Sequence, residues 1–297
     1  MGQNLRVMSA NLMNGGADPD TLASLVESLA VDVLAVQEVS HEQAEALSRL
    51  FDYGEIDPDR NYVGMGLLSR YPVTVERIPF TWGFGQTARM LPKDFASLCE
   101  PLEITNLHVA APHMVTPAPG PYLRWRQAGE FKRYLRASDA READRVIEQG
   151  DQPVLSPNCS TINSSSAIEV NTGEGSPLCP GEYLREGKAA PTNLADPKRL
   201  KKDAVPGPAR VLVGDFNSTP YWPWYWRMDS QFTDAAVTVA NMSGESPKPT
   251  WGPWPGSSRV LRIDHGFLRR VDAEGFEVVD VAGSDHCALV MDLVLPV

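Results

Sequence analysis

Apolar residues in the first forty positions follow the periods of a strand, a helix and a second strand. The first strand pattern covers 5–12 and has a polar end. Asp18 and Pro19 then form an N-cap and first-turn pair, which predicts the start of a helix. The run 31–36 predicts a buried strand that delivers Glu38 at its C-terminal end. The helical stripe between the two strands, spaced i, i+3, i+4 and i+7, consists of Leu22, Leu25, Val26 and Leu29.

The rest of the chain is dominated by strand patterns, several of which follow one another with no helix between them. Helices are expected over 41–50 and 122–136, and strands over 61–69, 73–80, 102–109, 210–214, 259–268, 276–281 and 287–295. An opening of alternating strand and helix followed by strand-rich stretches predicts the α+β class, with mixed sheets that are covered by helices.

One long segment lacks such periodicity. From about residue 142 to 208, prolines, glycines and serines crowd a stretch whose apolar content is too thin for a core of its own. Structureless loops longer than about 12–15 residues are uncommon inside compact domains and often serve as lids or linkers. We therefore expect a single domain over 1–297 with a lid-like insertion at about 142–208.

Composition narrows the class of protein. The 297 residues are 42% hydrophobic and 22% charged, which is typical of a globular domain with a large core. No apolar run approaches the roughly 18 residues of a membrane-spanning helix, so no such helix is expected. The first residues lack a basic and apolar leader pattern, which predicts a cytoplasmic protein, or a secreted one if a leader has been removed.

Charge and cysteine content add two expectations. The net charge of −11 disfavours non-specific adhesion to nucleic acid or to anionic membranes. Cys99 and Cys287 lie in apolar, strand-like surroundings and are expected to be buried free thiols. Cys159 and Cys179 lie in the polar insertion, where a disulfide between them is an alternative that needs an oxidising compartment.

Polar residues stand at the ends of apolar strands in six places. Any one of them has a structural explanation, because Asp and Asn at strand ends commonly cap turns. Strand ends at one edge of a sheet converge, however, and a cluster of carboxylates with Asn and His suits Mg²⁺ or Mn²⁺. The residues are Asn11, Glu38, His108, Asp215 with Asn217, Asp264, and Asp285 with His286.

Six short segments carry these residues and together resemble a known family. The segments are Ser9-Ala10-Asn11, Gln37-Glu38, Asn106-Leu107-His108, Gly214-Asp215-Phe216-Asn217, Arg262-Ile263-Asp264-His265 and Ser284-Asp285-His286. In this order they resemble the endonuclease/exonuclease/phosphatase superfamily, which includes deoxyribonuclease I, neutral sphingomyelinases and inositol-polyphosphate 5-phosphatases. The resemblance implies a four-layer α/β/β/α sandwich of two mixed, mainly antiparallel sheets.

The resemblance also implies a role for each residue. Glu38 resembles the principal metal-ligand glutamate of the family, and Asn11 and Asp285 complete that metal site. His286 resembles the histidine that activates the attacking water, and Asp264 is similar to the aspartate that orients it.

Three further residues complete the implied catalytic set. Asp215 is similar to the aspartate that positions the nucleophile or a second metal, and Asn217 and His108 resemble the pair that binds the phosphoryl oxygens. Hydrolysis of a phosphodiester independently requires a divalent cation, fixed hydrogen-bond donors and a base with a pKa near neutrality. His286 and Asp215 both remain candidates for that base.

Aromatic and basic residues suggest different substrates. Aromatic residues after Asn217 predict either a rim that holds an apolar or flat group, or a local hydrophobic cluster. Basic residues gather at 198–202 and on the 122–136 helix, where we expect a solvated outer face. The aromatic residues are Tyr221, Trp222, Trp224, Tyr225, Trp226, Trp251 and Trp254, and the helical basic residues are Arg124, Arg126, Lys132, Arg133 and Arg136.

The sequence therefore favours a monomeric, divalent-metal-dependent phosphoesterase that acts on a small or lipid-linked substrate. Cleavage of nucleic acid is the alternative, since a basic segment could reach it. A catalytically inactive binding module on the same fold is a third hypothesis, which the presence of every chemical residue in the six segments disfavours.

The insertion provides a first testable prediction. If it influences access or specificity without belonging to the core, replacing it by a short Gly/Ser linker leaves a folded protein that still hydrolyses a small phosphodiester. Circular dichroism and a chromogenic diester assay measure both properties. An unfolded deletion protein would show that the segment belongs to the core.

Overall fold

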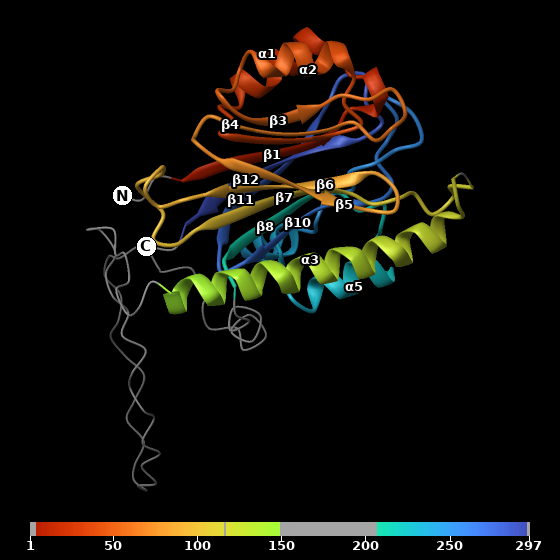
Figure 1. The fold of residues 1–297 in the computed structure, drawn as a ribbon. Coiled ribbons are helices and arrows are strands. Elements are labelled where there is room, and N and C mark those ends of the chain that lie inside the picture. The colour runs from red at the N-terminus through yellow and green to blue at the C-terminus, as the bar shows by residue number, and fades with distance from the viewer. Residues whose placement is uncertain (1–3, 116, 149–206, 296–297) are drawn as a thin grey trace, which may run out of the picture.

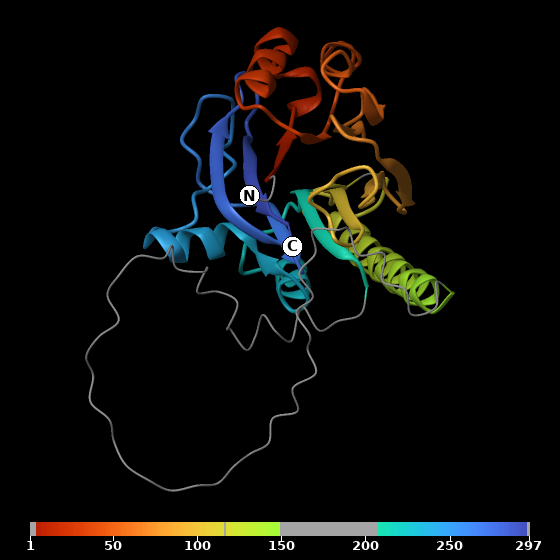
Figure 2. The ribbon, with the colours of Figure 1, turned by 90° about the vertical axis from the view of Figure 1, so that its left-hand side faces the viewer.

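Two six-stranded sheets form the centre of the protein in a computed structural model, which describes residues 4–115, 117–148 and 207–295. The first sheet has the order β11-β12-β1-β2-β4-β3 and the second β5-β6-β7-β8-β10-β9. Helices α1 and α2 cover the first sheet, and α3 and α5 cover the second, as Figure 1 shows. Figure 2 shows the same order of layers from the side. The predicted four-layer α/β/β/α sandwich is confirmed.

The bounds of the elements follow the chain. The strands are β1 Leu5–Asn11, β2 Val33–Gln37, β3 Tyr53–Asp57, β4 Met65–Ser69, β5 Thr74–Pro79, β6 Phe84–Met90, β7 Leu102–His108, β8 Ala209–Asp215, β9 Thr233–Asp234, β10 Asp264–Arg269, β11 Asp272–Asp280 and β12 Cys287–Val294. The helices are α1 Pro19–Ser28, α2 His41–Ser48, α3 Gly120–Glu148, α5 Pro223–Asp229 and α6 Ala235–Ser243. Among the described strands, only β1–β2 and β7–β8 pair in parallel, so both sheets are mixed and mainly antiparallel.

Three hydrophobic cores separate the four layers because side chains alternate along each strand. In β1, Leu5 and Val7 face the core between the sheets, while Met8 packs into the core under α1 and α2. In β8, Val211 faces the core between the sheets and Leu212 faces the core beneath α3 and α5. The central strands are therefore apolar on both faces, which explains why they appeared as continuous apolar runs in the sequence.

Strands with polar faces escaped the sequence analysis. β6 was not predicted, because Gln86 and Thr87 interrupt its apolar pattern although both are buried. The Thr87 hydroxyl is 2.9 Å from that of Thr105 on the neighbouring strand β7, which compensates its burial. The expected strand over 259–268 was too long, since only its second half forms β10 and Leu261 makes an isolated bridge.

The expected insertion begins later than the sequence suggested. Helix α3 continues through Glu142, whose carboxylate pairs with Arg89 at 2.6 Å, and ends at Glu148. Strand β8 then begins at Ala209, so the insertion itself lies outside the described residues. Gly207, which is described, lies at the C-terminal end of the insertion beside Asp139. Strand β8 begins just after it, about 20 Å along the strand from Asp215 at the other end. The described C-terminal end of the insertion therefore lies far from Asp215.

Two described cysteines behave differently from each other. Cys287 is free and buried, as predicted. Cys99 is disulfide-bonded, so the prediction of a free thiol there is wrong. Its apolar sequence context indicated burial, but it carries no information about a distant partner. The proposed pairing of Cys159 with Cys179 lies outside the described residues. Within the described part of the chain, no helix combines the length and hydropathy needed to cross a membrane.

A buried ion-pair network attaches helix α3 to the second sheet. Arg210 on β8 is fully buried, and its guanidinium donates to Glu103 on β7 at 2.8 Å and to Asp139 on α3 at 2.6 Å. Arg269 on β10 also binds Asp139, at 2.8 Å. The Ser138 hydroxyl donates to both carboxylate oxygens of Glu103. Each buried charge therefore depends on its partners for compensation.

Removing one member of this network should destabilise the protein strongly. We expect Arg210→Ala to lower the free energy of unfolding by about 3–5 kcal/mol, because it leaves buried carboxylates without a counter-charge. Urea denaturation measures the effect. The matched control is Arg49→Ala, which removes an i,i+4 pair with Glu45 whose side chains are 70% and 73% exposed, and it should change stability by less than about 1 kcal/mol.

Candidate active site

Strand direction brings the predicted site residues to one edge of the two sheets. β1 and β2 run in parallel, so Asn11 ends its strand beside the position that precedes Glu38. β7 and β8 are also parallel, and their last residues, His108 and Asp215, are register partners. β10 runs in the opposite direction, so its first residue, Asp264, pairs with Asp215. The register alone therefore places residues from five strands at one edge.

The two sheets meet through Asn11 and Asp215. The Asn11 amide donates to Glu38 Oε1 at 3.0 Å in its own sheet and to Asp215 Oδ2 at 3.2 Å in the other sheet. His108 Nε2 lies 3.5 Å from Glu38 Oε1 and 3.7 Å from Asp215 Oδ2. One ligand atom each from Glu38, His108 and Asp215 lies within 4.8 Å of the others, a spacing that suits a shared cation.

A second cluster consists of His286, Asp264 and Asp215. His286 Nδ1 is 3.0 Å from both carboxylate oxygens of Asp264, and its Nε2 is 3.9 Å from Asp215 Oδ2. The Asp264 carboxylate accepts a further hydrogen bond of 2.6 Å from the hydroxyl of Thr250. With Nδ1 bound to Asp264, Nε2 is the nitrogen of His286 that remains available for proton transfer. Sequence analysis missed Thr250, because a lone Thr in a loop carries no signal.

Two residues of the site have a strained backbone conformation. Glu38 and Asn217 have φ values of 55° and 45°, in the left-handed region that non-glycine residues rarely occupy. Asn217 donates from its backbone N–H to Asp215 Oδ1 at 2.7 Å and from its side chain to Val109 O at 2.9 Å. Such conformations cost about 1–3 kcal/mol each and persist where surrounding contacts fix them, frequently at functional sites.

Asp285 lies in the site but outside the two close clusters. Its Oδ2 accepts a 3.0 Å hydrogen bond from the indole of Trp251, and its backbone carbonyl accepts from Arg259 at 2.7 Å. It lines the same cavity as Glu38 and His286. Of the predicted metal ligands, Asn11 and Glu38 are in direct contact and Asp285 faces the same space, so the ligand set stays a prediction.

Burial and neighbouring charges shift the pKa values of four residues in the site: Glu38, Asp215, His286 and His108. Burial raises the pKa of Glu38 to about 7 and that of Asp215 to about 7. Burial disfavours the charged form of His286, but the carboxylates of Asp264 and Asp215 outweigh it and raise its pKa to about 10. Burial lowers the pKa of His108 to about 4, and the positive charge of the neighbouring His286 lowers it further.

These shifts indicate that the site suits a hard cation. Glu38 and Asp215 are buried carboxylates whose charge is poorly compensated by the protein, and oxygen donors of this type favour Mg²⁺ or Mn²⁺. The neutral state of His108 at ordinary pH leaves its Nε2 able to donate to an anionic ligand or to bind a metal. Positive charge placed beside Glu38 would stabilise its ionised form.

A cavity of about 970 Å³ opens above the clusters. Its floor carries Glu38, His108, Asp215, Asn217, Asp285 and His286. Its wall is aromatic and aliphatic, and it contains no Lys or Arg among the described lining residues. The wall includes Tyr62, Trp82, Met114, Val115, Trp222, Trp251 and Leu261. Sequence analysis missed Tyr62, Trp82 and Met114, which come from loops outside the six segments.

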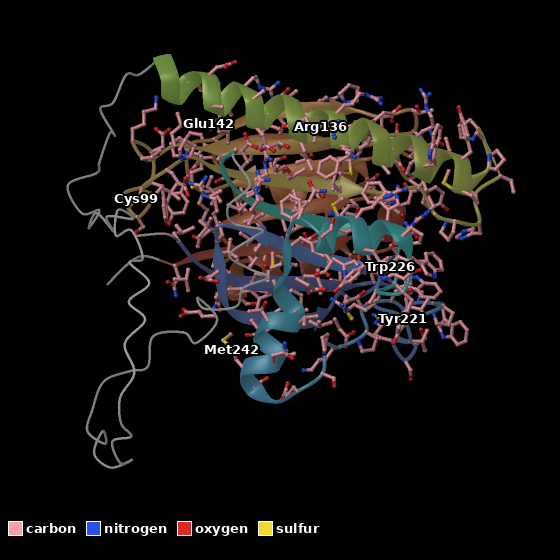
Figure 3. All side chains as sticks on the ribbon, turned by 90° about the horizontal axis from the view of Figure 1, so that it is seen from below. Cys99, Arg136, Glu142, Tyr221, Trp226 and Met242 are labelled. Atoms are coloured by element: carbon pink, nitrogen blue, oxygen red, sulfur yellow. The ribbon has the colours of Figure 1, made fainter. Side chains whose placement is uncertain are left out.

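The predicted aromatic cluster is divided between two environments. Trp222 and Trp251 line the cavity, as the rim hypothesis expected. Trp224 and Tyr225 are buried in the core beneath α3 and α5, as the alternative expected. Figure 3 shows Tyr221 and Trp226 at one end of the molecule, while Cys99 lies toward the other.

The other described histidines lie in three different surroundings. His265 is fully buried, and its Nε2 is 2.6 Å from the backbone carbonyl of Ser218, which is typical of a structural residue. His41 is exposed at the start of α2. His113 lines the cavity.

A protein-family model matches most of the chain. The model of the Endonuclease/Exonuclease/phosphatase family matches residues 8–286. A search of curated proteins found no match.

Solved structures share the fold. A conserved protein from Enterococcus faecalis V583 has 10% sequence identity and a TM-score of 0.59, with 98% of this chain and 99% of that chain covered. An endonuclease/exonuclease/phosphatase from Bacteroides vulgatus has 14% identity and a TM-score of 0.57, with 99% of both chains covered. TDP2 from D. rerio, solved with a single-strand DNA product, has 14% identity and a TM-score of 0.53, with 98% and 99% covered. At these identities the likeness concerns the fold alone.

Metal binding tests the geometry directly. Isothermal titration should detect Mg²⁺ or Mn²⁺ binding to the wild-type protein, and Glu38→Gln should weaken it at least tenfold because one charged oxygen ligand is lost. Glu27→Gln, an exposed change on α1, is the matched control and should bind as wild type does. Equal affinity of Glu38→Gln and the wild-type protein would contradict the predicted site.

Proposed function

The chain belongs to the Endonuclease/Exonuclease/phosphatase family, and we propose that it hydrolyses a phosphoester bond with the help of a divalent cation. Members of this family are hydrolases that act on such bonds. The observation that carries the proposal is the joint position of Glu38, Asp215 and His286 on the floor of one cavity, with Asp264 bound to His286 Nδ1. The attack of water on a phosphorus centre requires groups of these types.

Three residues would hold the cation in this proposal. Glu38 is the principal ligand, and Asn11 and Asp285 complete the set, with Mg²⁺ or Mn²⁺ as the ion. When bound, a divalent cation neutralises charge on the phosphoryl oxygens and lowers the pKa of coordinated water. The buried, poorly compensated carboxylate of Glu38 supports this role.

His286 accepts the proton of the attacking water through Nε2. Asp264 binds Nδ1 at 3.0 Å, which fixes the tautomer and stabilises the imidazolium that forms, and Thr250 holds Asp264 in turn. In the surrounding field of carboxylates, the pKa of His286 is raised to about 10. Positive charge near the ring favours its neutral form, so a base of this kind depends on compensation of the neighbouring carboxylates.

Asp215, Asn217 and His108 position the reacting groups. Asp215 lies 3.9 Å from His286 Nε2 and can orient the water between them, or act as an alternative base. The side-chain amide of Asn217 donates a 3.0 Å hydrogen bond to Asp215 Oδ2, and His108 lies at the floor of the cavity. In this proposal both side chains donate to the oxygens of a phosphoryl group, where negative charge develops in the transition state, and Asn217 exchanges one of its two present hydrogen bonds for that contact.

The wall of the cavity favours a substrate with an apolar or flat group next to the phosphate. Trp82, Trp222, Trp251 and Leu261 present hydrophobic surface, and no cation among the described lining residues would track successive phosphates of a polymer. We therefore propose a small or lipid-linked phosphoester. Cleavage of nucleic acid is the alternative, supported by the similarity to the TDP2 structure that contains a single-strand DNA product.

A panel of substrates separates these functions. Bis(p-nitrophenyl) phosphate, phospholipid vesicles, inositol phosphates, single-stranded DNA, plasmid DNA and RNA are each incubated with Mg²⁺ or Mn²⁺, with EDTA as the negative condition. Turnover of lipid or small phosphoesters is the expected result. Turnover of nucleic acid alone would favour the alternative, and full activity in EDTA would contradict the metal-dependent reaction.

The base provides a sharper prediction. His286→Ala should lower kcat by about 10²–10⁴-fold, because removal of a general base typically costs that much, while the protein stays folded. Thr250→Val should lower kcat less, since Asp264 keeps its bond to the histidine but loses one donor. His41→Ala is the matched control and should retain full activity. Wild-type turnover by His286→Ala would refute the assigned role.

A further inference from the structure

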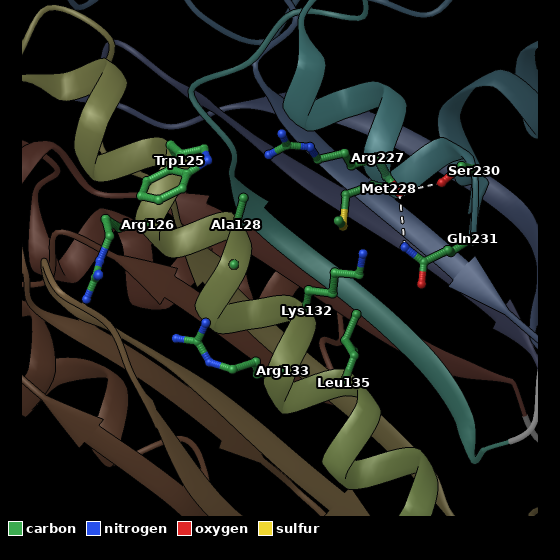
Figure 4. Close-up of a pocket in the computed structure, with 11 residues that line it drawn as sticks. Trp125, Arg126, Ala128, Lys132, Arg133, Leu135, Arg227, Met228, Ser230 and Gln231 are labelled. Atoms are coloured by element: carbon green, nitrogen blue, oxygen red, sulfur yellow. Dashed lines mark hydrogen bonds between the residues drawn. The ribbon is translucent and has the colours of Figure 1, made fainter.

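A second hollow lies on the helical layer, away from the sheet edge that carries the site. It is a groove of about 390 Å³ between α3 and α5, and it shares no lining residue with the cavity above the clusters. Figure 4 shows its residues projecting from the two helices. The lining residues are Trp125, Arg126, Ala128, Gly129, Lys132, Arg133, Leu135, Arg227, Met228, Ser230 and Gln231.

The basic residues of α3 do not form the uniform solvated face that their sequence suggested. Arg124 is buried, and its guanidinium donates to the backbone carbonyl of Ala110 at 2.8 Å. Arg126, Lys132 and Arg133 instead line the groove, together with Arg227 from α5. The tertiary structure thus adds a fourth cation that the helix alone could not supply.

Most of this positive charge is uncompensated. Arg126 is 3.6 Å from Glu130, a pair within α3. Within the described part of the chain, Lys132, Arg133 and Arg227 have no carboxylate within 4.0 Å. The whole chain has a net charge of −11, so this concentration of free cations is opposite to the protein's average. Cations that are gathered in one hollow repel one another, and an anion bound between them would relieve that repulsion.

The groove also offers flat and apolar surface beside the cations. Trp125 is 62% exposed and stands at the wall, and Ala128, Leu135 and Met228 supply further apolar lining. Gly129 adds no side chain to the groove, and a Cβ built there would lie 3.6 Å from Arg133 Nη1. Ser230 and Gln231 donate to the backbone carbonyl of Arg227 at 2.8 and 3.3 Å, which fixes the end of α5 beside the groove.

We propose that this groove is a nucleotide-binding site. The phosphates would bind Lys132, Arg133 and Arg227, and the base would lie against the exposed indole of Trp125. Guanidinium groups bind phosphate oxygens in pairs of hydrogen bonds, and aromatic side chains stack on bases of any sequence. The volume lies within the range of small-ligand sites, which favours one nucleotide over a polymer that would need an extended track.

Binding of ADP in EDTA tests the proposal without dependence on the proposed hydrolysis, because chelation removes the metal that the reaction would need. Isothermal titration of the full chain should show ADP binding that is at least tenfold weaker in Lys132→Glu/Arg227→Glu. The matched control is Arg136→Glu, which makes the same charge change on an exposed residue of α3 outside the groove and should alter affinity less than twofold. Circular dichroism checks that each variant is folded.

Two further measurements separate the contribution of the base to binding from that of the phosphates. Pyrophosphate should bind more weakly than ADP, and Trp125→Leu should weaken ADP binding severalfold while leaving pyrophosphate unchanged. Absence of ADP binding, or binding that Lys132→Glu/Arg227→Glu does not weaken, would overturn the proposal. A single-stranded oligonucleotide that binds much more tightly than ADP, and loses its affinity in the same variant, would overturn it in favour of a polymer track.

Discussion

The amide of Asn11 is the contact on which the site depends, because it joins the two sheets at the level of the chemistry. It donates at once to Glu38 in the first sheet and to Asp215 in the second, at 3.0 and 3.2 Å. Two buried carboxylates that face each other would otherwise repel across the interface. The parallel pairs β1–β2 and β7–β8 are the reason that these side chains can meet, since each pair ends at the same edge.

The site is organised for chemistry at the expense of local stability. Glu38 and Asp215 have raised pKa values because burial disfavours their charge, and Glu38 and Asn217 hold left-handed backbone conformations. The opposite arrangement occurs around Arg210, where each buried charge is paired within the protein. The buried charges around Arg210 are thus compensated within the protein, whereas those of Glu38 and Asp215 are compensated weakly, which is common at functional sites.

Charge is distributed unevenly over the molecule as well. Acidic side chains gather on the floor of the cavity, and free cations gather in the groove between α3 and α5. The two regions adjoin at α5, which begins directly after Trp222 of the cavity wall. In a chain of net negative charge, the buried carboxylates and the free cations thus lie in separate hollows.

Sequence by itself determined the strand ends and their chemistry. Apolar runs such as 31–36 and 287–295 are long enough to be recognised as strands, and the polar residue that terminates each run stands out against them. The α+β class followed from that pattern and the family from the resemblance of the six segments, and both are borne out. The structure also brings Glu38, Asp215, Asp264 and His286 close together. Only the tertiary structure decided the rest. Thr250, Tyr62 and the α3–α5 groove depend on packing between segments that are distant in the chain, and periodicity within one segment carries no record of its neighbours in space.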